Sequence, residues 1–142
     1  THADEMKPFS VKLIKRDYKD ASGATAKIVV QELLTQDNVD VLAGWVYSPN
    51  AIATAPLVSA GKKLAVLMNA GTAHITNMSP YYVRTSFSMW HAGHALGEAA
   101  AKQLGAKTAV IGYTDFPPGK DSLAAFKMAF EANGGKVIDE VP

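Results

Sequence analysis

The sequence has no cysteine, almost no net charge and no long apolar run. Without cysteine, disulfides, thiolate metal ligands and cysteine nucleophiles are excluded. Its 142 residues carry 14 basic and 13 acidic side chains and show no basic patch, so a nucleic-acid partner is not expected. No apolar run approaches the roughly 20 residues that span a bilayer, so direct membrane insertion is not expected either. This composition is that of an ordinary globular protein.

Catalytic and cofactor motifs are also missing. No G-x-G-x-x-G follows a predicted strand, no G-x-S-x-G surrounds a serine, and Gly112 and Gly119 have the wrong spacing for a phosphate loop. His91 and His94 lie three apart, a spacing that metal sites use, but no third ligand accompanies them. We therefore expect neither an enzyme, nor a cofactor, nor a metal site.

Predicted strands and helices alternate along the chain. Periodicity and turn residues indicate strands at 11–16, 39–43, 64–68, 81–87, 108–113 and 136–141, and helices at 22–35, 48–60, 88–104 and 121–133. This alternation predicts an α/β fold with mostly parallel strands. Within the third helix, Gly93 and Gly97 form a G-x-x-x-G pattern, which in an aqueous protein predicts close packing of the helix on the sheet.

The chain is organised around residues 39–60, which read as a buried strand, Gly44, an aromatic loop and a helix that opens at Ser48-Pro49. Serine is a favoured N-cap, and proline at the first helical position has no N–H to leave unpaired. A helix N-terminus that follows the carboxyl end of a strand suits an anion, because its free N–H groups point outward. The same residues also suit a helix start with no ligand. Local evidence favours that second interpretation.

The chain as a whole resembles the type I periplasmic solute-binding proteins of ABC transporters, in the branch of the leucine/isoleucine/valine-binding proteins. The likeness is carried in order by residues 26–44, 48–60, 69–73 (N-A-G-T-A), 82–95 and 107–138. It implies a two-lobed α/β fold with parallel Rossmann-like sheets, incomplete in this chain. Residues 1–86 would form most of the first lobe and residues 87–142 the start of the second. Further segments are expected before Thr1 and after Pro142.

The resemblance also implies a function. We expect a non-enzymatic, extracytoplasmic protein, periplasmic or lipid-anchored, that captures a small carboxylate and delivers it to an ABC transporter permease. The ligand would be an aromatic acid, or a branched-chain or aromatic amino acid. The alternative is a ligand-sensing regulatory or receptor domain of the same fold.

In the first lobe, the family binds the ligand carboxylate through hydroxyl and backbone N–H groups of two loops. The matching positions here are Tyr47, Ser48, Ala70, Gly71 and Thr72. Such donors suit a carboxylate without a buried cation. With the resemblance, ligand contact becomes the favoured interpretation for Ser48. Trp45 either walls the pocket or packs the loop.

In the second lobe, Trp90 and His91 lie in the first turn of the 88–104 helix, where they can face the cleft. A tryptophan there suits a flat ligand by stacking, although it can equally flank the helix's buried stripe. Pro118 stands where the family has a tyrosine, and Phe116 is the candidate substitute. The aromatic side chains of these loops favour an aromatic acid, since no acidic residue is evident to pair with the α-ammonium group of an amino acid.

Overall fold

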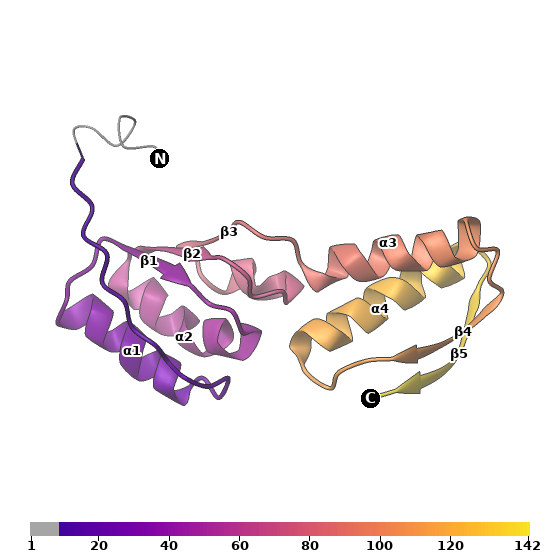
Figure 1. The fold of residues 1–142 in the computed structure, drawn as a ribbon, viewed down its shortest axis with the longest axis horizontal. Coiled ribbons are helices and arrows are strands. Elements are labelled where there is room, and N and C mark those ends of the chain that lie inside the picture. Colours follow the sequence, from indigo (N-terminus) through magenta and orange to yellow (C-terminus); the bar gives the residue numbers. More distant parts are fainter. Residues whose placement is uncertain (1–8) are drawn as a thin grey trace.

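The computed structural model describes residues 9–142, which fold into two α/β parts (Figure 1). The N-terminal part contains α1 (Ala24–Thr35), β1 (Val41–Gly44), α2 (Ser48–Gly61), β2 (Leu64–Leu67), the 3-10 helix η1 (Ala73–Met78) and β3 (Tyr82–Arg84). The C-terminal part contains α3 (Met89–Lys102), β4 (Thr108–Gly112), α4 (Pro117–Ala132) and β5 (Lys136–Val141).

Both sheets are parallel, which confirms the predicted α/β class. The N-terminal sheet has the order β1-β2-β3, and β4 pairs with β5 in the C-terminal sheet. The N-terminal core lies between the sheet and α2, where Leu67, Val58 and Ile75 are fully buried. Because the strands are parallel, the loops after β1, β2 and β3 all emerge at one edge of this sheet. That edge faces the C-terminal part in Figure 1.

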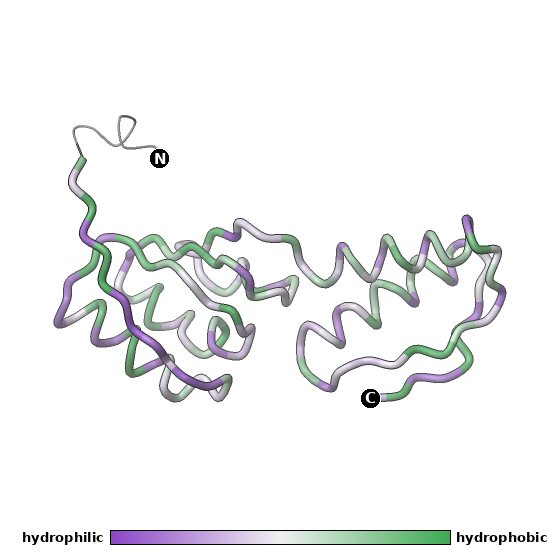
Figure 2. Tube along the Cα trace, viewed as in Figure 1, coloured by the Kyte–Doolittle hydropathy of each residue, from purple (hydrophilic) through white to green (hydrophobic). Residues whose placement is uncertain are grey.

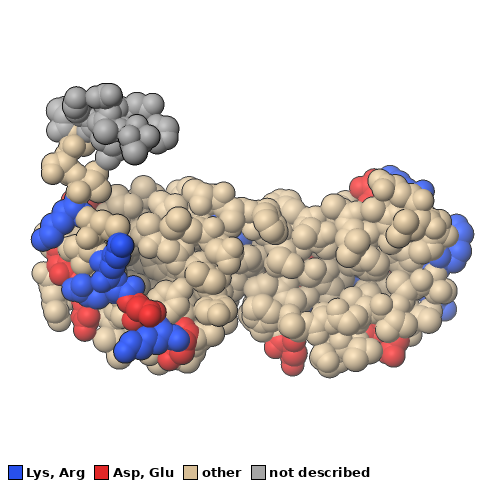
Figure 3. Space-filling model, in the orientation of Figure 1, with Lys and Arg blue, Asp and Glu red and all other residues tan. Residues whose placement is uncertain are grey.

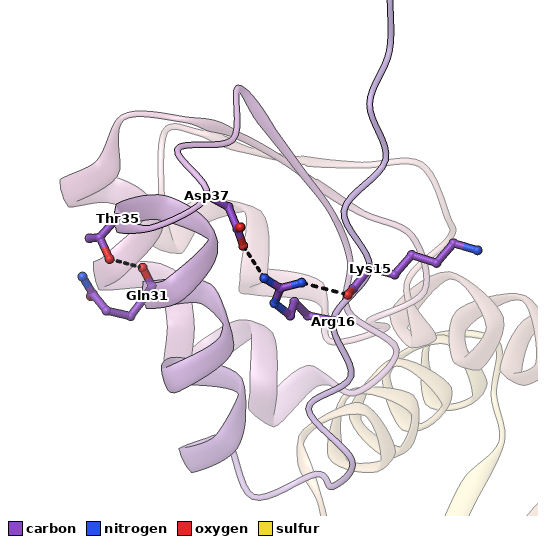
Figure 4. A network of polar contacts seen from close by, with 5 residues as sticks. All are labelled: Lys15, Arg16, Gln31, Thr35 and Asp37. Atoms are coloured by element: carbon purple, nitrogen blue, oxygen red, sulfur yellow. Dashed lines mark hydrogen bonds and ion pairs between the residues drawn. The ribbon is translucent and has the colours of Figure 1, made fainter.

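The strand predicted at 11–16 is wrong. Within the described residues this segment pairs with no other strand, and Val11 and Leu13 are largely exposed. Alternating apolar residues make a strand only where a neighbouring strand supplies hydrogen bonds. The stretch leading into α1 is hydrophilic (Figure 2), and Arg16 ties it to the end of α1 through a 2.7 Å ion pair with Asp37 (Figure 4).

The helix predicted at 121–133 begins four residues earlier, at Pro117. No helix was predicted over these four residues. Instead, Pro117 and Pro118 occupy the first helical positions, where a missing N–H costs nothing. This brings the N-terminus of α4 to the boundary between the two parts.

The G-x-x-x-G pattern packs α3 against α4, so the predicted packing on a sheet is wrong. A Cβ atom added at Gly93 or Gly97 would collide with the backbone carbonyl oxygen of Ser122 or Phe126, respectively. Both glycines are buried, whereas Leu96, a large apolar residue of the same helix, is 61% exposed. The backbones of the two helices are therefore in direct contact at these two glycines.

We predict that Gly97→Ala lowers the free energy of unfolding by about 1–3 kcal/mol, because the added methyl group forces the helix backbones apart. Helix propensity acts in the opposite direction, since alanine is favoured over glycine by about 1 kcal/mol. Urea unfolding measures the change. The exposed Ala95→Gly variant is the control, and its free energy of unfolding should fall only by the difference in helix propensity. A Gly97→Ala protein more stable than wild type would contradict the close packing of α3 on α4.

Candidate functional site

A cleft of about 250 Å³ lies where the loops of the N-terminal sheet meet the C-terminal part. Its walls come from the loops after β1, β2 and β3, the start of α3 and the start of α4. The lining residues are Val46, Tyr47, Ser48, Asn69, Gly71, Ser86, Phe87, Met89, Phe116 and Pro118. A larger groove of about 620 Å³ lies elsewhere, along the outer side chains of α1 and α2. It is less suited to a specific small ligand, because no strand end or loop reaches it.

Three helix N-termini lie at or beside the cleft, and no charged side chain is among its described lining residues. Helices α2, α3 and α4 start at or beside it, at Ser48, Met89 and Pro117. Helix N-termini carry partial positive charge. Among the described residues that line the cleft, none is Asp, Glu, Lys, Arg or His. On the face drawn in Figure 3, the larger charge clusters likewise lie toward the two ends of the molecule.

Residues 70–73, here called the 70–73 loop, follow β2 and are held by Arg84 at the end of β3. The guanidinium donates to the carbonyl oxygens of Thr72 at 2.7 Å and Ala73 at 3.0 Å, with a longer contact of 3.3 Å to Ala70. The planar fork of arginine suits several acceptors at once. Arg84 thus pulls the loop's carbonyl groups toward β3.

Two further hydrogen bonds connect this loop to its neighbours. The N–H of Thr72 donates to Ser48 Oγ at 3.1 Å, which joins the loop to the start of α2. The N–H of Met89 donates to the carbonyl oxygen of Gly71 at 2.8 Å, which joins it to the start of α3. A Cβ atom at Gly71 would lie 3.1 Å from Met89 Cγ, so a side chain there would narrow the cleft.

The structure separates the nine sequence-predicted site residues into two groups. Those that line the cleft are Tyr47, Ser48, Gly71 and Phe116. Those that do not line it are Trp45, Ala70, Thr72, Trp90 and His91. The first group comes from both parts of the molecule.

Trp45 packs the loop instead of walling the cleft. Its indole is 5% exposed, donates from Nε1 to Thr54 Oγ1 at 2.9 Å, and meets the Tyr82 ring edge to face. Its backbone is left-handed, with φ 61°, a conformation that costs a bulky residue about 1–3 kcal/mol. Its carbonyl oxygen accepts the N–H of Ala70 at 2.9 Å. Trp45 therefore anchors the turn that presents Tyr47 and Ser48.

Ala70 and Thr72 act through the backbone of the 70–73 loop. Both are fully buried, and their carbonyl groups accept from Arg84. The hydroxyl of Thr72 is buried and has no hydrogen-bond partner within residues 9–142. Neither residue contributes a side chain to the cleft lining.

His91 caps α3. Its Nδ1 accepts the N–H of Ser88 at 3.1 Å and lies 3.0 Å from Ser88 Oγ, which completes a capping box at the N-terminus of the helix. Trp90 is partly buried beside it in the same turn. The role of His91 seen in the structure is thus to fix where α3 starts.

Sequence reasoning missed several lining residues. The missed residues are Val46, Asn69, Ser86, Phe87, Met89 and Pro118. Ser86 is the most informative, because the residue lines the cleft while its hydroxyl is buried and has no partner within the described chain. Its place just after β3, at the edge where the other loops emerge, is the signal that would have found it.

The cleft lies at the carboxyl edge of a parallel sheet, where open α/β sheets bind their ligands, and residues of the second α/β part line its other side. The sequence profile of the family described as periplasmic binding protein matches residues 9–142. The chain belongs to this family, which is one of binding proteins and not of enzymes. Within residues 9–142, no helix is both long and apolar enough to cross a membrane.

Relatives of known structure share the fold. A solute-binding protein of an ABC transporter from Rhodopseudomonas palustris BisB5, in complex with 3,4-dihydroxybenzoic acid, is 40% identical with a TM-score of 0.87; the match covers 92% of this chain and 35% of that one. One from R. palustris HaA2, in complex with p-hydroxybenzoic acid, is 44% identical with a TM-score of 0.84, covering 90% and 34%.

A curated relative, the Leu/Ile/Val-binding protein homolog 6 of Brucella abortus (strain 2308), is 35% identical over 140 residues. That match covers 99% of this chain and 36% of the relative. The chain therefore spans about a third of the length of the proteins it matches.

The buried Tyr82, which contacts Trp45, makes the free energy of unfolding depend on pH in the alkaline range. Burial raises the pKa of Tyr82 from 10.0 to about 12, against the smaller opposite effect of its hydrogen bond with Thr54. The unfolded chain loses this proton at a lower pH than the folded chain. The contribution of Tyr82 to the free energy of unfolding is therefore fully present below pH 10.0, and about 2 kcal/mol of it is lost as the pH rises to about 12.

We predict that Tyr82→Phe abolishes that part of the decline and, by losing the 2.7 Å bond to the Ala51 carbonyl oxygen, also lowers stability at neutral pH by about 1 kcal/mol. Denaturant unfolding across alkaline pH measures both effects. Tyr81→Phe is the matched control and should keep the wild-type decline. Parallel curves for wild type and Tyr82→Phe would contradict the assignment.

Proposed function

We propose that this chain forms part of an extracytoplasmic solute-binding protein that captures an aromatic carboxylate for import by an ABC transporter. The observation that carries the proposal is the cleft itself, in which helix N-termini and hydroxyl groups meet apolar and aromatic side chains without an acidic one among the described lining residues. Such a surface suits a ligand that carries a negatively charged group on an apolar ring.

The carboxylate would lie against the start of α2 and the 70–73 loop. Ser48 is 1% exposed and lines the cleft next to the first N–H groups of α2, which have no intrahelical acceptors. Gly71 lets the loop backbone approach without a side chain. Donors of this kind hold an anion by hydrogen bonds and by the helix dipole, with no need for a cation.

The ring would lie between the two parts. Tyr47 and Phe116 are half-exposed aromatic side chains on opposite parts, and Phe87 and Met89 extend the apolar wall. The α-ammonium group of an amino acid requires an acidic or carbonyl-rich partner. The absence of an acidic side chain from the described lining therefore favours an aromatic acid over leucine or isoleucine.

The relatives support the same choice. The two R. palustris proteins, at 40% and 44% identity, hold dihydroxybenzoic and p-hydroxybenzoic acid, respectively. We extend to this chain their ABC-transporter role, with a permease as partner and the periplasm as its location. We also propose that residues 1–86 and 87–142 belong to separate lobes that close over the ligand; the first eight lie outside the described residues.

We predict that the full-length protein carrying this chain binds 4-hydroxybenzoate and benzoate, measured by isothermal titration calorimetry and thermal shift. At 100 times the Kd, ligand should stabilise the fold by about 2.7 kcal/mol. Phenol, which lacks the carboxylate, and isoleucine, which lacks the ring, are matched control ligands and should leave the melting temperature unchanged. Binding of isoleucine with no response to the benzoates would overturn the aromatic proposal.

We further predict that Ser86→Ala weakens binding of 4-hydroxybenzoate about fivefold, because a ligand oxygen loses the free hydroxyl. The free energy of unfolding without ligand should change by less than about 0.5 kcal/mol, since the hydroxyl has no partner among the described residues. The exposed Ser10→Ala variant is the control. Unchanged affinity in Ser86→Ala would remove this residue from the site.

A further inference from the structure

Ala73, the last residue of the 70–73 loop, forms hydrogen bonds with both parts of the molecule. The carbonyl oxygen of Ala73 accepts from Arg84 at 3.0 Å, within the N-terminal part. The N–H of Ala73 donates to Asp121 Oδ2 at 2.7 Å, in the C-terminal part. The N–H of Ala73 is thus bonded to an acidic side chain and its carbonyl oxygen to a basic one.

Asp121 lies one turn after the start of α4, the helix whose first residues line the cleft. Phe116 and Pro118 face the cleft, and Asp121 reaches past them to the loop after β2. Within residues 9–142, this is the one side-chain hydrogen bond that joins α4 to the N-terminal part. It is partly buried, so water competes with it less than at an open surface.

We propose that Asp121 is a positioning residue for ligand binding, which couples the placement of α4 to that of the 70–73 loop. The proposal rests on the proposed function, because its consequence concerns a ligand held between the two parts. A ligand leaves such a cleft when one wall moves away from the other. If α4 moves, the bond between Asp121 and Ala73 must break together with the contacts to the ligand, so this side chain slows dissociation.

The test uses the full-length protein carrying this chain and 4-hydroxybenzoate, with rates from stopped-flow fluorescence. Asp121→Ala should raise the dissociation rate about tenfold, the lower end of what a hydrogen bond to a charged group contributes, and leave the association rate within about twofold. Asp121→Asn keeps an acceptor oxygen, so its dissociation rate should lie close to that of the wild type. Glu131→Ala removes the same charge from the exposed end of α4 and should bind as wild type.

A second measurement works without ligand. Amide hydrogen exchange at Ala73 should be about tenfold faster in Asp121→Ala than in wild type or Glu131→Ala, because the N–H loses its acceptor. Wild-type dissociation in Asp121→Ala would overturn the proposal, as would equal losses in the Asn and Ala variants. If the wild-type protein binds no aromatic acid, the proposed function fails. The exchange at Ala73 then decides on Asp121 separately: unchanged exchange overturns the coupling, and faster exchange sustains it.

Discussion

The hydrogen bonds from Arg84 to the carbonyl oxygens of Thr72 and Ala73 are the interaction on which the rest of the site depends. Parallel pairing brings the ends of β2 and β3 side by side, and the arginine reaches back from one strand end to the loop that leaves the other. With its carbonyl groups turned toward the guanidinium, the loop bonds to the start of α2 through Thr72 N–H and to α4 through Ala73 N–H.

A strained backbone conformation at Trp45 also shapes the carboxyl edge of the N-terminal sheet. Trp45 adopts a left-handed conformation that a tryptophan avoids, and the cost is offset by its buried ring, its bond to Thr54 and its contact with Tyr82. The result is a sharp turn between β1 and α2 that brings Tyr47 and Ser48 to the cleft. Rigid turns of this kind hold the loop backbone and the helix start in fixed positions at a cleft whose described lining residues include no charged side chain.

Sequence reasoning predicted much of the fold because local patterns determine it. The continuous apolar run at 64–68 and the strand at 136–141 appear within a residue of their expected bounds. The family resemblance, rather than any local pattern, pointed to Ser48 and Gly71, which line the cleft. Local patterns failed where an element depends on contacts with residues distant in the sequence. The 11–16 segment has the alternation of a strand but no neighbouring strand in the described residues.

Side-chain roles were harder to predict than strands. An aromatic residue in a loop suits a pocket wall and a core equally, and only the bond to Thr54 assigns Trp45 to the core. A histidine at the third position of a helix suits a ligand and a capping box equally, and the Ser88 contact assigns His91 to the cap. Ser86 gives no motif at all. Its place just after β3 is the sequence signal that points to the cleft, whereas its buried hydroxyl, which has no partner among the described residues, is visible only in three dimensions.

The proposed function places an aromatic carboxylate at the carboxyl edge of β1–β3. Titrating 4-hydroxybenzoate into the isotope-labelled full-length protein and following backbone amide shifts by NMR tests it most directly. We expect the largest changes at Ser48, Gly71 and Ser86, with little change along the outer groove of α1 and α2. Changes confined to that groove, at residues such as Lys27 and Gln31, would contradict it.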